Sequence, residues 1–339
     1  MNSISIKIIS FIFFVLFLAS CDNTEQDQKK SDNDKITDTT LLKEKNNFLF
    51  LTEWFDKVGV YKYDLTKKKY SPVWWHPREN VVMLIYKPGN LPSYFFTSDK
   101  IGTRGGFPSF SRLKIFIISN DLSETKQIDE IGDGIQFTAV WNDDNNLEVI
   151  YTQVDLVMAS YVNEYTRLYD HYGKLIDSSI RTFDIQNNGF PELVSARNST
   201  VSPSGKFGVS IRSDSVFFKT TTSDSLKLIS VLNHNLNKLK WSEDENYIFI
   251  STLDANDEKV NTKNPETSQL LIYSVIADSL IGSFGGAGIK NFFPLNDLLI
   301  FDDGFAINSV INIFDLKEKK IVDIVNTKRG CGLVVIPQM

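Results

Sequence analysis

Residues 237–284 of the 339-residue sequence read NKLKWSEDENYIFISTLDANDEKVNTKNPETSQLLIYSVIADSLIGSF, and this stretch decides the fold class. An apolar run precedes the polar turn from Ser242 to Asn246, and a second apolar run, Tyr247 to Thr252, follows it. After a polar excursion come two more runs, Leu270 to Val275 and Ser279 to Phe284. Short runs rich in β-branched and aromatic residues, separated by turn residues, are typical of antiparallel strands. The stretch therefore predicts a four-stranded antiparallel meander.

The same pattern recurs along the chain. Five polar turns, each opened by an aromatic residue or Val and followed by an apolar run, mark the repeats: WHPREN at 75–80, WNDDNN at 141–146, VSPSGK at 201–206, WSEDEN at 241–246 and FPLND at 293–297. Clusters of Pro, Ser, Asn and Asp favour tight turns, here between the first two strands of each meander. These turns resemble the W-x-S-P-D-G-K signature of TolB-like and related six-bladed propeller repeats, with SPSGK as the nearest match. The resemblance implies an architecture and no activity.

The number of repeats predicts an all-β, six-bladed β-propeller. Propeller repeats commonly span ~40 to 50 residues, and six of them account for the chain after residue 47. The first unit, Phe48 to Val73, has three apolar runs instead of four, while Leu333 to Ile336 remains as a solitary run at the C-terminus. We expect this C-terminal strand to join the first blade, because such closure removes the exposed sheet edges. The alternatives are seven blades, a β-sandwich or an open chain of hairpins.

The N-terminus has the pattern of an export signal. Lys7 precedes an apolar run from Ile8 to Leu18, which is too short to span a bilayer. The tetrad from Leu18 to Cys21 resembles the lipobox of bacterial lipoproteins, which implies cleavage before Cys21 and lipidation of its thiol. The alternative is a signal cut elsewhere, with Cys21 incidental. The predicted organisation is a signal peptide at 1–20, a disordered tether at 21–47 that is poor in apolar residues, and a propeller domain at 48–339.

The lipid predicts a membrane-bound, cell-envelope location. Acidic residues soon after the cysteine, Asp22, Glu25 and Asp27, resemble the signals that send lipoproteins of Bacteroidota to the outer surface. An Asp directly after the cysteine is, in enterobacteria, associated with retention at the inner membrane. We expect the outer membrane, with the leaflet left open. The 36 basic side chains are interleaved with 42 acidic ones, which argues against nucleic acid as a partner.

Long segments of the sequence fall on one expected face. In a four-stranded blade, loops between the second and third strands emerge beside the loops that join consecutive blades. The longest insertion, Lys87 to Arg112, belongs to this class. Aromatic and Arg side chains, which are favoured at interaction hot spots, gather in these segments and form the predicted binding set: Trp54, Tyr94, Phe95, Phe96, Arg104, Phe107, Phe110 and Arg329. The alternative for Phe95 and Phe96 is an edge hairpin of the same blade that packs on its own neighbours.

The sequence offers no cofactor or metal motif. The three histidines lie far apart in different repeats, the Gly-rich segments lack a following Lys-Ser or Lys-Thr, and no G-x-S-x-G pattern is present. Cys331, in RGCGLVV, fits a small buried apolar residue. We therefore expect a lipid-anchored binding or scaffold protein for a protein or glycan partner. The alternative is a propeller enzyme of lactonase, dehydrogenase or lyase type that acts on a small molecule or sugar at the central channel.

Overall fold

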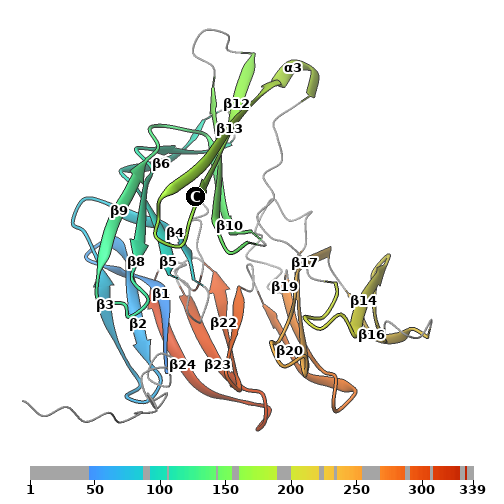
Figure 1. The fold of residues 1–339 in the computed structure, drawn as a ribbon. Helices are drawn as coiled ribbons and strands as arrows, with labels where there is room; N and C mark the ends of the chain where they lie inside the picture. Colours follow the sequence, from blue (N-terminus) through green and yellow to red (C-terminus); the bar gives the residue numbers. More distant parts are fainter. Residues whose placement is uncertain are drawn as a thin grey trace, which may run out of the picture. The chain divides into compact units, whose positions relative to one another are not determined.

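The computed structural model describes residues 46–86, 92–104, 107–142, 144–154, 160–188, 200–220, 225–232, 235–253, 268–286, 291–305, 308–328 and 333. Within these ranges the chain consists of antiparallel strands and one helical turn, α3 (Ile185–Asn188) (Figure 1). None of the helices in the described ranges has the length and apolar character needed to cross a bilayer. The all-β class predicted from the repeats is confirmed.

The strands form successive meanders. Sheet A contains β1 (Asn47–Trp54), β2 (Lys57–Asp64) and β3 (Lys69–Trp74). Sheet B contains β4 (Asn80–Ile85), β5 (Ser93–Ser98), β8 (Lys114–Ile118) and β9 (Thr125–Glu130), with the two-stranded sheet C, β6 (Lys100–Arg104) and β7 (Phe107–Ser111), inserted between β5 and β8. Sheet D contains β10 (Gln136–Trp141), β11 (Leu147–Val154), β12 (Tyr161–Tyr169) and β13 (Leu175–Asp184).

The second half continues in the same way. Sheet E contains β14 (Phe207–Arg212), β15 (Ser215–Thr220) and β16 (Lys227–Val231). Sheet F contains β17 (Asn235–Trp241), β18 (Tyr247–Leu253), β19 (Ser268–Ser274) and β20 (Ser279–Gly286). Sheet G contains β21 (Phe292–Leu295), β22 (Leu298–Phe305), β23 (Asn308–Asp315) and β24 (Lys320–Lys328). Sheet F is the meander predicted from residues 237–284.

Sheet B corrects one part of the predicted repeat. Trp74 ends β3 of sheet A, so the WHPREN segment connects two sheets and does not turn between two strands of one meander. The run Tyr94 to Phe96 lies in β5, the second strand of sheet B. Tyr94 and Phe96 pack toward sheet D, and Phe95 packs toward sheet A. A strand buried on both faces has a continuous apolar run, which is why this segment lacks the alternation that identifies a half-exposed strand.

Sheet D ends in two long strands. β12 covers residues 161–169 and β13 covers residues 175–184. Polar residues such as Asn163 and Thr182 pair with each other in this part of the sheet, and an apolar pattern does not indicate such pairing.

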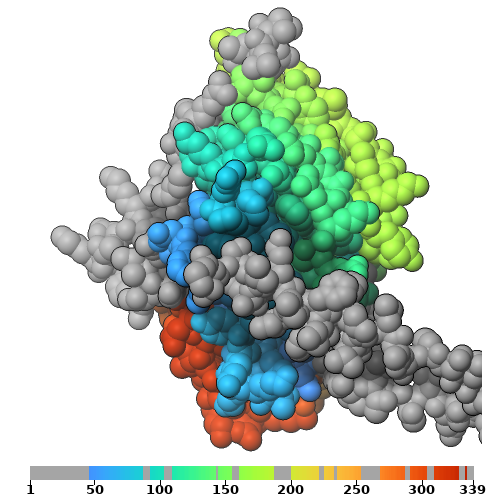
Figure 2. All heavy atoms as spheres, turned by 90° about the vertical axis from the view of Figure 1, so that its left-hand side faces the viewer, coloured from blue at the N-terminus to red at the C-terminus, as the bar shows by residue number. Residues whose placement is uncertain are grey.

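Five apolar cores join neighbouring sheets, in the order E, F, G, A, B, D. They contain, in turn, Val209 with Leu239, Phe249 with Phe292, Phe48 with Phe293, Leu49 with Val81, and Tyr94 with Tyr151. Among the described residues these cores bring together the first and last sheets of the chain, A and G. In Figure 2 the red segments of sheet G border the blue segments of sheet A.

Polar contacts also link sheets A and G. The Tyr63 hydroxyl donates a hydrogen bond of 2.6 Å to Oδ2 of Asp323. Burial, followed by the hydrogen bond to Asp323, raises the pKa of Tyr63 above its ordinary range. Leu333 is buried in the same core, and its backbone N–H donates to Oδ2 of Asp302 at 3.2 Å. Residue 333 is not in a strand; the remainder of the predicted C-terminal strand, 334–336, lies outside the described residues.

The two edges of a sheet differ in exposure. The first strands β4, β10 and β21 are buried or half-buried, although each forms an edge of its sheet. The last strands β9 and β13 are mostly exposed. Protected first strands are expected when the sheets surround a common centre, because unpaired edges there are shielded from other chains.

Candidate functional site

The predicted binding residues do not form one group in the structure. Tyr94, Phe95 and Phe96 are fully buried in the cores between sheets, so the prediction that they form a binding surface is wrong. Trp54 is exposed at the end of β1. Phe110 lies in the hairpin of sheet C.

Cys21 and Arg329 fall outside the described residues, as does Cys331. Arg104 and Phe107 occupy facing positions in the backbone register of the hairpin, next to its end. The described contacts join Trp54 to its neighbours in sheet A and Phe110 to residues of sheet D, without joining these two groups.

Phe110 fixes the base of the β6–β7 hairpin to sheet D. Its ring is buried and meets the ring of Phe137 edge-on, with the centroids 5.4 Å apart. Its backbone N–H and C=O exchange two 3.0 Å hydrogen bonds with Gly134. A Cβ atom at residue 134 would overlap the Phe110 ring, so only glycine fits there. The insertion is therefore a hairpin with an anchored base.

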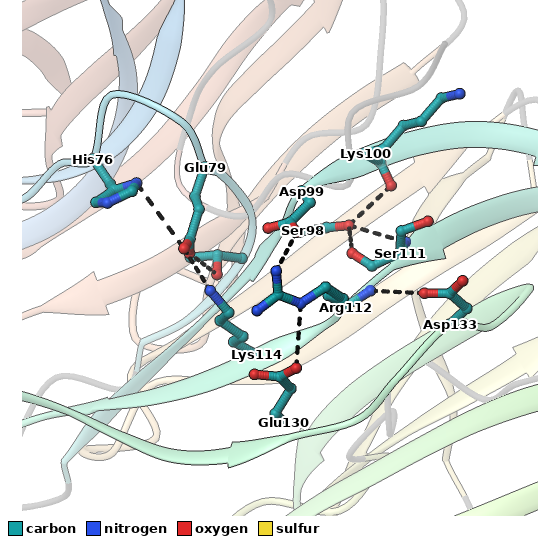
Figure 3. Close-up of polar contacts among 11 residues, drawn as sticks. His76, Glu79, Ser98, Asp99, Lys100, Ser111, Arg112, Lys114, Glu130 and Asp133 are labelled. Carbon is teal, nitrogen blue, oxygen red and sulfur yellow. Dashed lines mark hydrogen bonds and ion pairs between the residues drawn. The ribbon is translucent and has the colours of Figure 1, made fainter.

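Polar side chains hold the same base to sheet B (Figure 3). The Arg112 guanidinium donates to Oδ2 of Asp99 at 3.1 Å and to Oε1 of Glu130 at 3.3 Å. Ser98 donates its hydroxyl hydrogen toward the carbonyl oxygens of Lys100 and Ser111, at 2.9 and 2.7 Å. Loops and hairpins on a rigid scaffold are common carriers of function, because their ends do not move relative to the domain.

A second polar group lies beside this base, on the segment between sheets A and B. Glu79 accepts hydrogen bonds from Lys114 Nζ at 2.5 Å and from the Thr97 hydroxyl at 2.9 Å, and all three side chains are largely buried. Burial raises the pKa of Glu79, but the hydrogen bonds from Lys114 and Thr97 outweigh it and the net pKa is lowered. The Glu79 carboxylate is thus charged, and its two oxygens accept hydrogen bonds from Lys114 and Thr97. These bonds hold the segment between sheets A and B in place.

His76 makes a contact that the sequence did not predict. Its Nδ1 lies 4.0 Å from Oε1 of Glu79, and its ring stacks on Trp74 with centroids 6.1 Å apart. Within the described ranges, however, no group of three or more His, Cys, Asp or Glu side chains could hold a metal ion.

The aromatic turn, defined as Trp54 and Phe55 with the supporting Trp75, is the most exposed aromatic group of sheet A. Trp54 is 51% exposed and Phe55 is 77% exposed. The two rings meet edge-on at 5.1 Å, and Phe55 lies 6.4 Å from Trp75. Trp75 donates its indole N–H to the carbonyl oxygen of Trp54 at 2.9 Å. Trp75, in the segment after β3, therefore stabilises the turn through both contacts.

The backbone of this turn is unusual for its residues. Phe55 and Asp56 both adopt positive φ, 46° and 57°, as the tight two-residue hairpin turn requires. Asn and Gly are the usual residues at such positions. Behind the turn, a Cβ atom on Gly59 would lie 2.7 Å from the carbonyl oxygen of Trp74, so glycine allows the following segment to approach closely. Trp54 was among the predicted binding residues, whereas Phe55 was missed. The signal for Phe55 is a second consecutive aromatic residue, which falls in a two-residue turn between paired strands.

A different kind of site lies between sheets F and G. Lys238 of β17 is half-buried, with Nζ 4.9 Å from the centroid of the Phe292 ring and 3.5 Å from the Phe292 carbonyl oxygen. Burial, with a further contribution from the charge of Lys240, lowers the pKa of Lys238 to about 7. In the described residues no carboxylate forms an ion pair with this amine.

Asp302 of β22 is the carboxylate whose charge affects the pKa of Lys238. It accepts hydrogen bonds from the backbone and side chain of Asn291, at 2.6 and 3.1 Å, and from the backbone N–H of Leu333. Burial raises the pKa of Asp302 to about 6, while these hydrogen bonds and the charge of Lys238 oppose the rise. Two groups that titrate near neutrality are thus found near the first strands of sheets F and G. Perturbed pKa values of this kind gather at functional sites, although structural networks also produce them.

Comparison with known proteins gives likeness in fold only. No protein-family model matches the sequence, and no curated protein matches it significantly. Among solved structures, the chain is similar to TolB from Acinetobacter baumannii, with a TM-score of 0.47 and 10% identity over 87% of this chain. The chain spans 66% of that TolB chain, just under two thirds of its length.

Two further solved structures have different roles. One is a nidogen/laminin complex, with a TM-score of 0.41 and 12% identity, covering 84% of this chain and 95% of that one. The other is a putative 6-phosphogluconolactonase from Bacteroides fragilis, with a TM-score of 0.36 and 11% identity, covering 85% and 97%. At TM-scores below 0.5 and identities of 10–12%, these likenesses assign the chain to none of the three.

Proposed function

We propose that the protein is a lipid-anchored β-propeller of the cell envelope that binds a protein or glycan partner. In this proposal residues 1–20 are the signal peptide, Cys21 carries the lipid, residues 21–47 form the tether, and residues 48–339 form six blades closed by the C-terminal strand. The succession of meanders, the five inter-sheet cores and the contact of sheet A with sheet G support this arrangement. The outer membrane is the proposed location.

The observation that carries the binding function is the exposure of the aromatic turn. A side chain as apolar as Phe, 77% exposed and held in a left-handed backbone conformation, contributes nothing to the core. Trp and other aromatic residues dominate interaction hot spots because they bury large areas with few rotatable bonds. The brace from Trp75 fixes the position of the turn before any partner arrives, which lowers the entropy cost of binding.

The ring geometry favours a protein over a glycan. Trp54 and Phe55 are inclined at 85°, and Phe55 and Trp75 at 62°, so neighbouring rings do not form a shared flat surface. A sugar chain stacks best on coplanar, open aromatic faces. Inclined rings at the tip of a turn form a projection instead, and a projection fits an apolar pocket on a partner protein.

The proposal can be tested by co-purification from intact envelopes in mild detergent. The full-length protein is compared with the double variant Trp54→Ala/Phe55→Ala, and bound proteins and carbohydrate are quantified. We expect a partner that is retained by the wild type and reduced at least tenfold by the double variant, since two hot-spot truncations cost ~3 kcal/mol or more.

Tyr172→Ala provides the matched control. Tyr172 is 76% exposed on the β12–β13 turn, so its replacement removes an equally accessible aromatic ring elsewhere. The control variant should retain the partner. An identical set of bound molecules for all three proteins would refute the role of the aromatic turn, and loss of bound carbohydrate alone would identify a glycan partner.

One observation favours a second candidate function, an enzyme acting on a small molecule or sugar at the centre of the sheets. Lys238 and Asp302 have pKa values displaced toward neutrality, as general acids and bases require. The hydrogen bonds of Asp302 to Asn291 and Leu333 also have a structural role, which leaves binding as the favoured function.

A further inference from the structure

The outer strand of sheet D, β13, has an open edge, in that no other strand of the described ranges pairs with it there. It pairs with β12 on one side and is the last strand in the order of its sheet (Figure 1). It is ten residues long, and its side chains from Leu175 to Thr182 are exposed. Ile180 is 62% exposed. A long exposed edge strand is a template for pairing with another strand unless charge, proline or irregularity blocks it.

The geometry of an antiparallel edge limits how β13 can pair with a second β13. Successive residues direct their backbone N–H and C=O groups alternately toward β12 and toward the open edge. In an antiparallel pair, facing residues both direct these groups toward each other or both direct them away. When the two strands are identical, facing residues must therefore both be odd-numbered or both be even-numbered. A twofold axis meets this condition only when it passes through a residue position, where that residue faces its own copy. A β-bulge leaves Ile176 without a partner in β12, so the regular part of the strand begins at Asp177.

One of these allowed registers is self-complementary in charge. With the axis through Ser179, Asp177 of one copy faces Arg181 of the other, and the reverse pair forms at the same time. The adjacent registers, with the axis through Ser178 or Ile180, leave both charges opposite uncharged residues. The register through Ser179 also makes the two Ile180 side chains diagonal neighbours on one face, where cross-strand apolar pairs stabilise a sheet.

Two other outer strands lack this combination. In β24, Asp323 is odd-numbered while Lys320 and Lys328 are even-numbered, so no allowed register brings unlike charges face to face. In β9, Glu130 already pairs with Arg112 of its own chain, and the strand is only six residues long.

We propose that a second copy of this chain pairs with β13 through an antiparallel twofold contact centred on Ser179, which joins two D sheets into one continuous sheet. Arg181 also contacts its own chain: its guanidinium lies 3.5 Å from Oε1 of Glu164 and over the ring of Phe183. The Arg181 side chain is 69% exposed despite these contacts, so its outer side is accessible to Asp177 of the second copy. Asp177 Oδ1 accepts a 2.8 Å hydrogen bond from the backbone N–H of its own neighbour Ser178, and pairing of the two strands exchanges this bond for the contact with Arg181. The inference does not depend on the proposed binding function.

The register is tested by cysteine cross-linking in the full-length chain, with Cys21→Ser/Cys331→Ser as the background, so that the introduced thiol is the sole one in the sequence. Ser179→Cys should form an intermolecular disulfide, because residue 179 meets its own copy at the axis, where facing Cβ atoms lie ~5 Å apart. Thr182→Cys is the control: it is equally exposed, but its copy lies six residues along the opposite strand. We expect at least a tenfold excess of the cross-linked dimer for Ser179→Cys under mild oxidation.

Charge exchange tests the same contact without cysteines. Asp177→Arg or Arg181→Asp alone places like charges opposite each other twice, which should weaken dimerisation about tenfold in analytical ultracentrifugation. The double variant Asp177→Arg/Arg181→Asp restores both unlike pairs and should recover the dimer. Thermal unfolding of each variant separates loss of dimer from loss of fold.

Three results would overturn the proposal. They are equal cross-linking at 179 and 182, a monomer for the folded wild-type chain at all concentrations tested, and a Ser179→Cys adduct whose mass differs from twice that of the chain. The last result would assign the edge to a different protein.

Discussion

Phe55 and Lys238 both occupy positions that cost the fold free energy. Phe55 adopts a left-handed backbone conformation, which costs roughly 1–2 kcal/mol for a residue with a side chain. Lys238 places an amine in a half-buried site beside Phe292, where burial disfavours its charged form. Strained positions of this kind cluster at functional sites. Substitutions at these two residues should therefore raise the free energy of unfolding while they reduce function.

The variant Lys238→Met should be more stable than the wild type at neutral pH. The folded-state pKa of Lys238, about 7, is below its unfolded value of 10.5, so the unfolded chain binds more protons between these pH values. The wild-type free energy of unfolding should therefore rise from pH 7 to pH 10 through this residue. Methionine removes the charge and fills similar volume, which should flatten that part of the profile.

Urea unfolding at pH 7 and pH 9.5 measures this difference. Lys126→Met is the control, because Lys126 is exposed on β9 of sheet B and its charge does not contribute to the pKa of Lys238. An unchanged pH profile in Lys238→Met would show that the amine is solvated in the folded protein.

At the scale of elements, the β6–β7 hairpin shows how an insertion is made rigid. Phe110 enters the core between sheets B and D, Gly134 provides the space for its ring, and Arg112 pairs with carboxylates on both sides. The base of the hairpin is thereby fixed to sheets B and D. This is the property expected of an element that meets a partner.

The variant Gly134→Ala should destabilise the protein by ~2 kcal/mol, because the new methyl group overlaps the Phe110 ring. Phe110→Ala alone should cost ~3 kcal/mol through the cavity it leaves. In the double variant the overlap is absent, so its cost should be less than the sum of the two single costs. A double-mutant cycle by urea unfolding measures the coupling. Strict additivity would mean that Gly134 and Phe110 do not contact each other.

The sequence predicted the meanders better than the insertion. Sheet F follows residues 237–284 closely, since its strands alternate with clear turn residues. Tyr94, Phe95 and Phe96 were assigned to the binding set because they lie in the longest insertion, which is rich in aromatic and Arg side chains. In the structure they pack on two different sheets, and a contact between distant segments cannot be read from local pattern. The exposure of Phe55 was missed because the sequence around it resembles the end of an ordinary strand, where an aromatic side chain is commonly buried.

At the scale of the whole molecule, the packing of sheet A on sheet G makes the two ends of the domain depend on each other. Phe48 near the start of the domain and Leu333 near the end of the chain share one apolar core. The tether from Cys21 would leave from the same sheet, because β1 begins at Asn47. The lipid anchor itself was predicted from the sequence, and residues 1–45 lie outside the described part of the chain.

The variant Cys21→Ser should release the protein from membranes. A serine at this position cannot form the thioether to lipid. The variant protein therefore lacks the acyl chains that would hold it at the membrane. Fractionation of cells, with metabolic labelling by a fatty-acid analogue, measures both localisation and lipidation. Cys331→Ser is the control and should leave both unchanged. Continued labelling of the Cys21→Ser protein would contradict the assignment of the lipidated residue.

The most direct test of the central claim is site-specific photo-cross-linking from the aromatic turn in living cells. A photoreactive phenylalanine analogue replaces Phe55 in the full-length chain, and the same analogue replaces Tyr172 in the comparison strain. We expect a discrete covalent adduct with one envelope component from position 55, and no such adduct from position 172. Absence of any adduct from position 55, or the same adducts from both positions, would contradict a binding role for the aromatic turn.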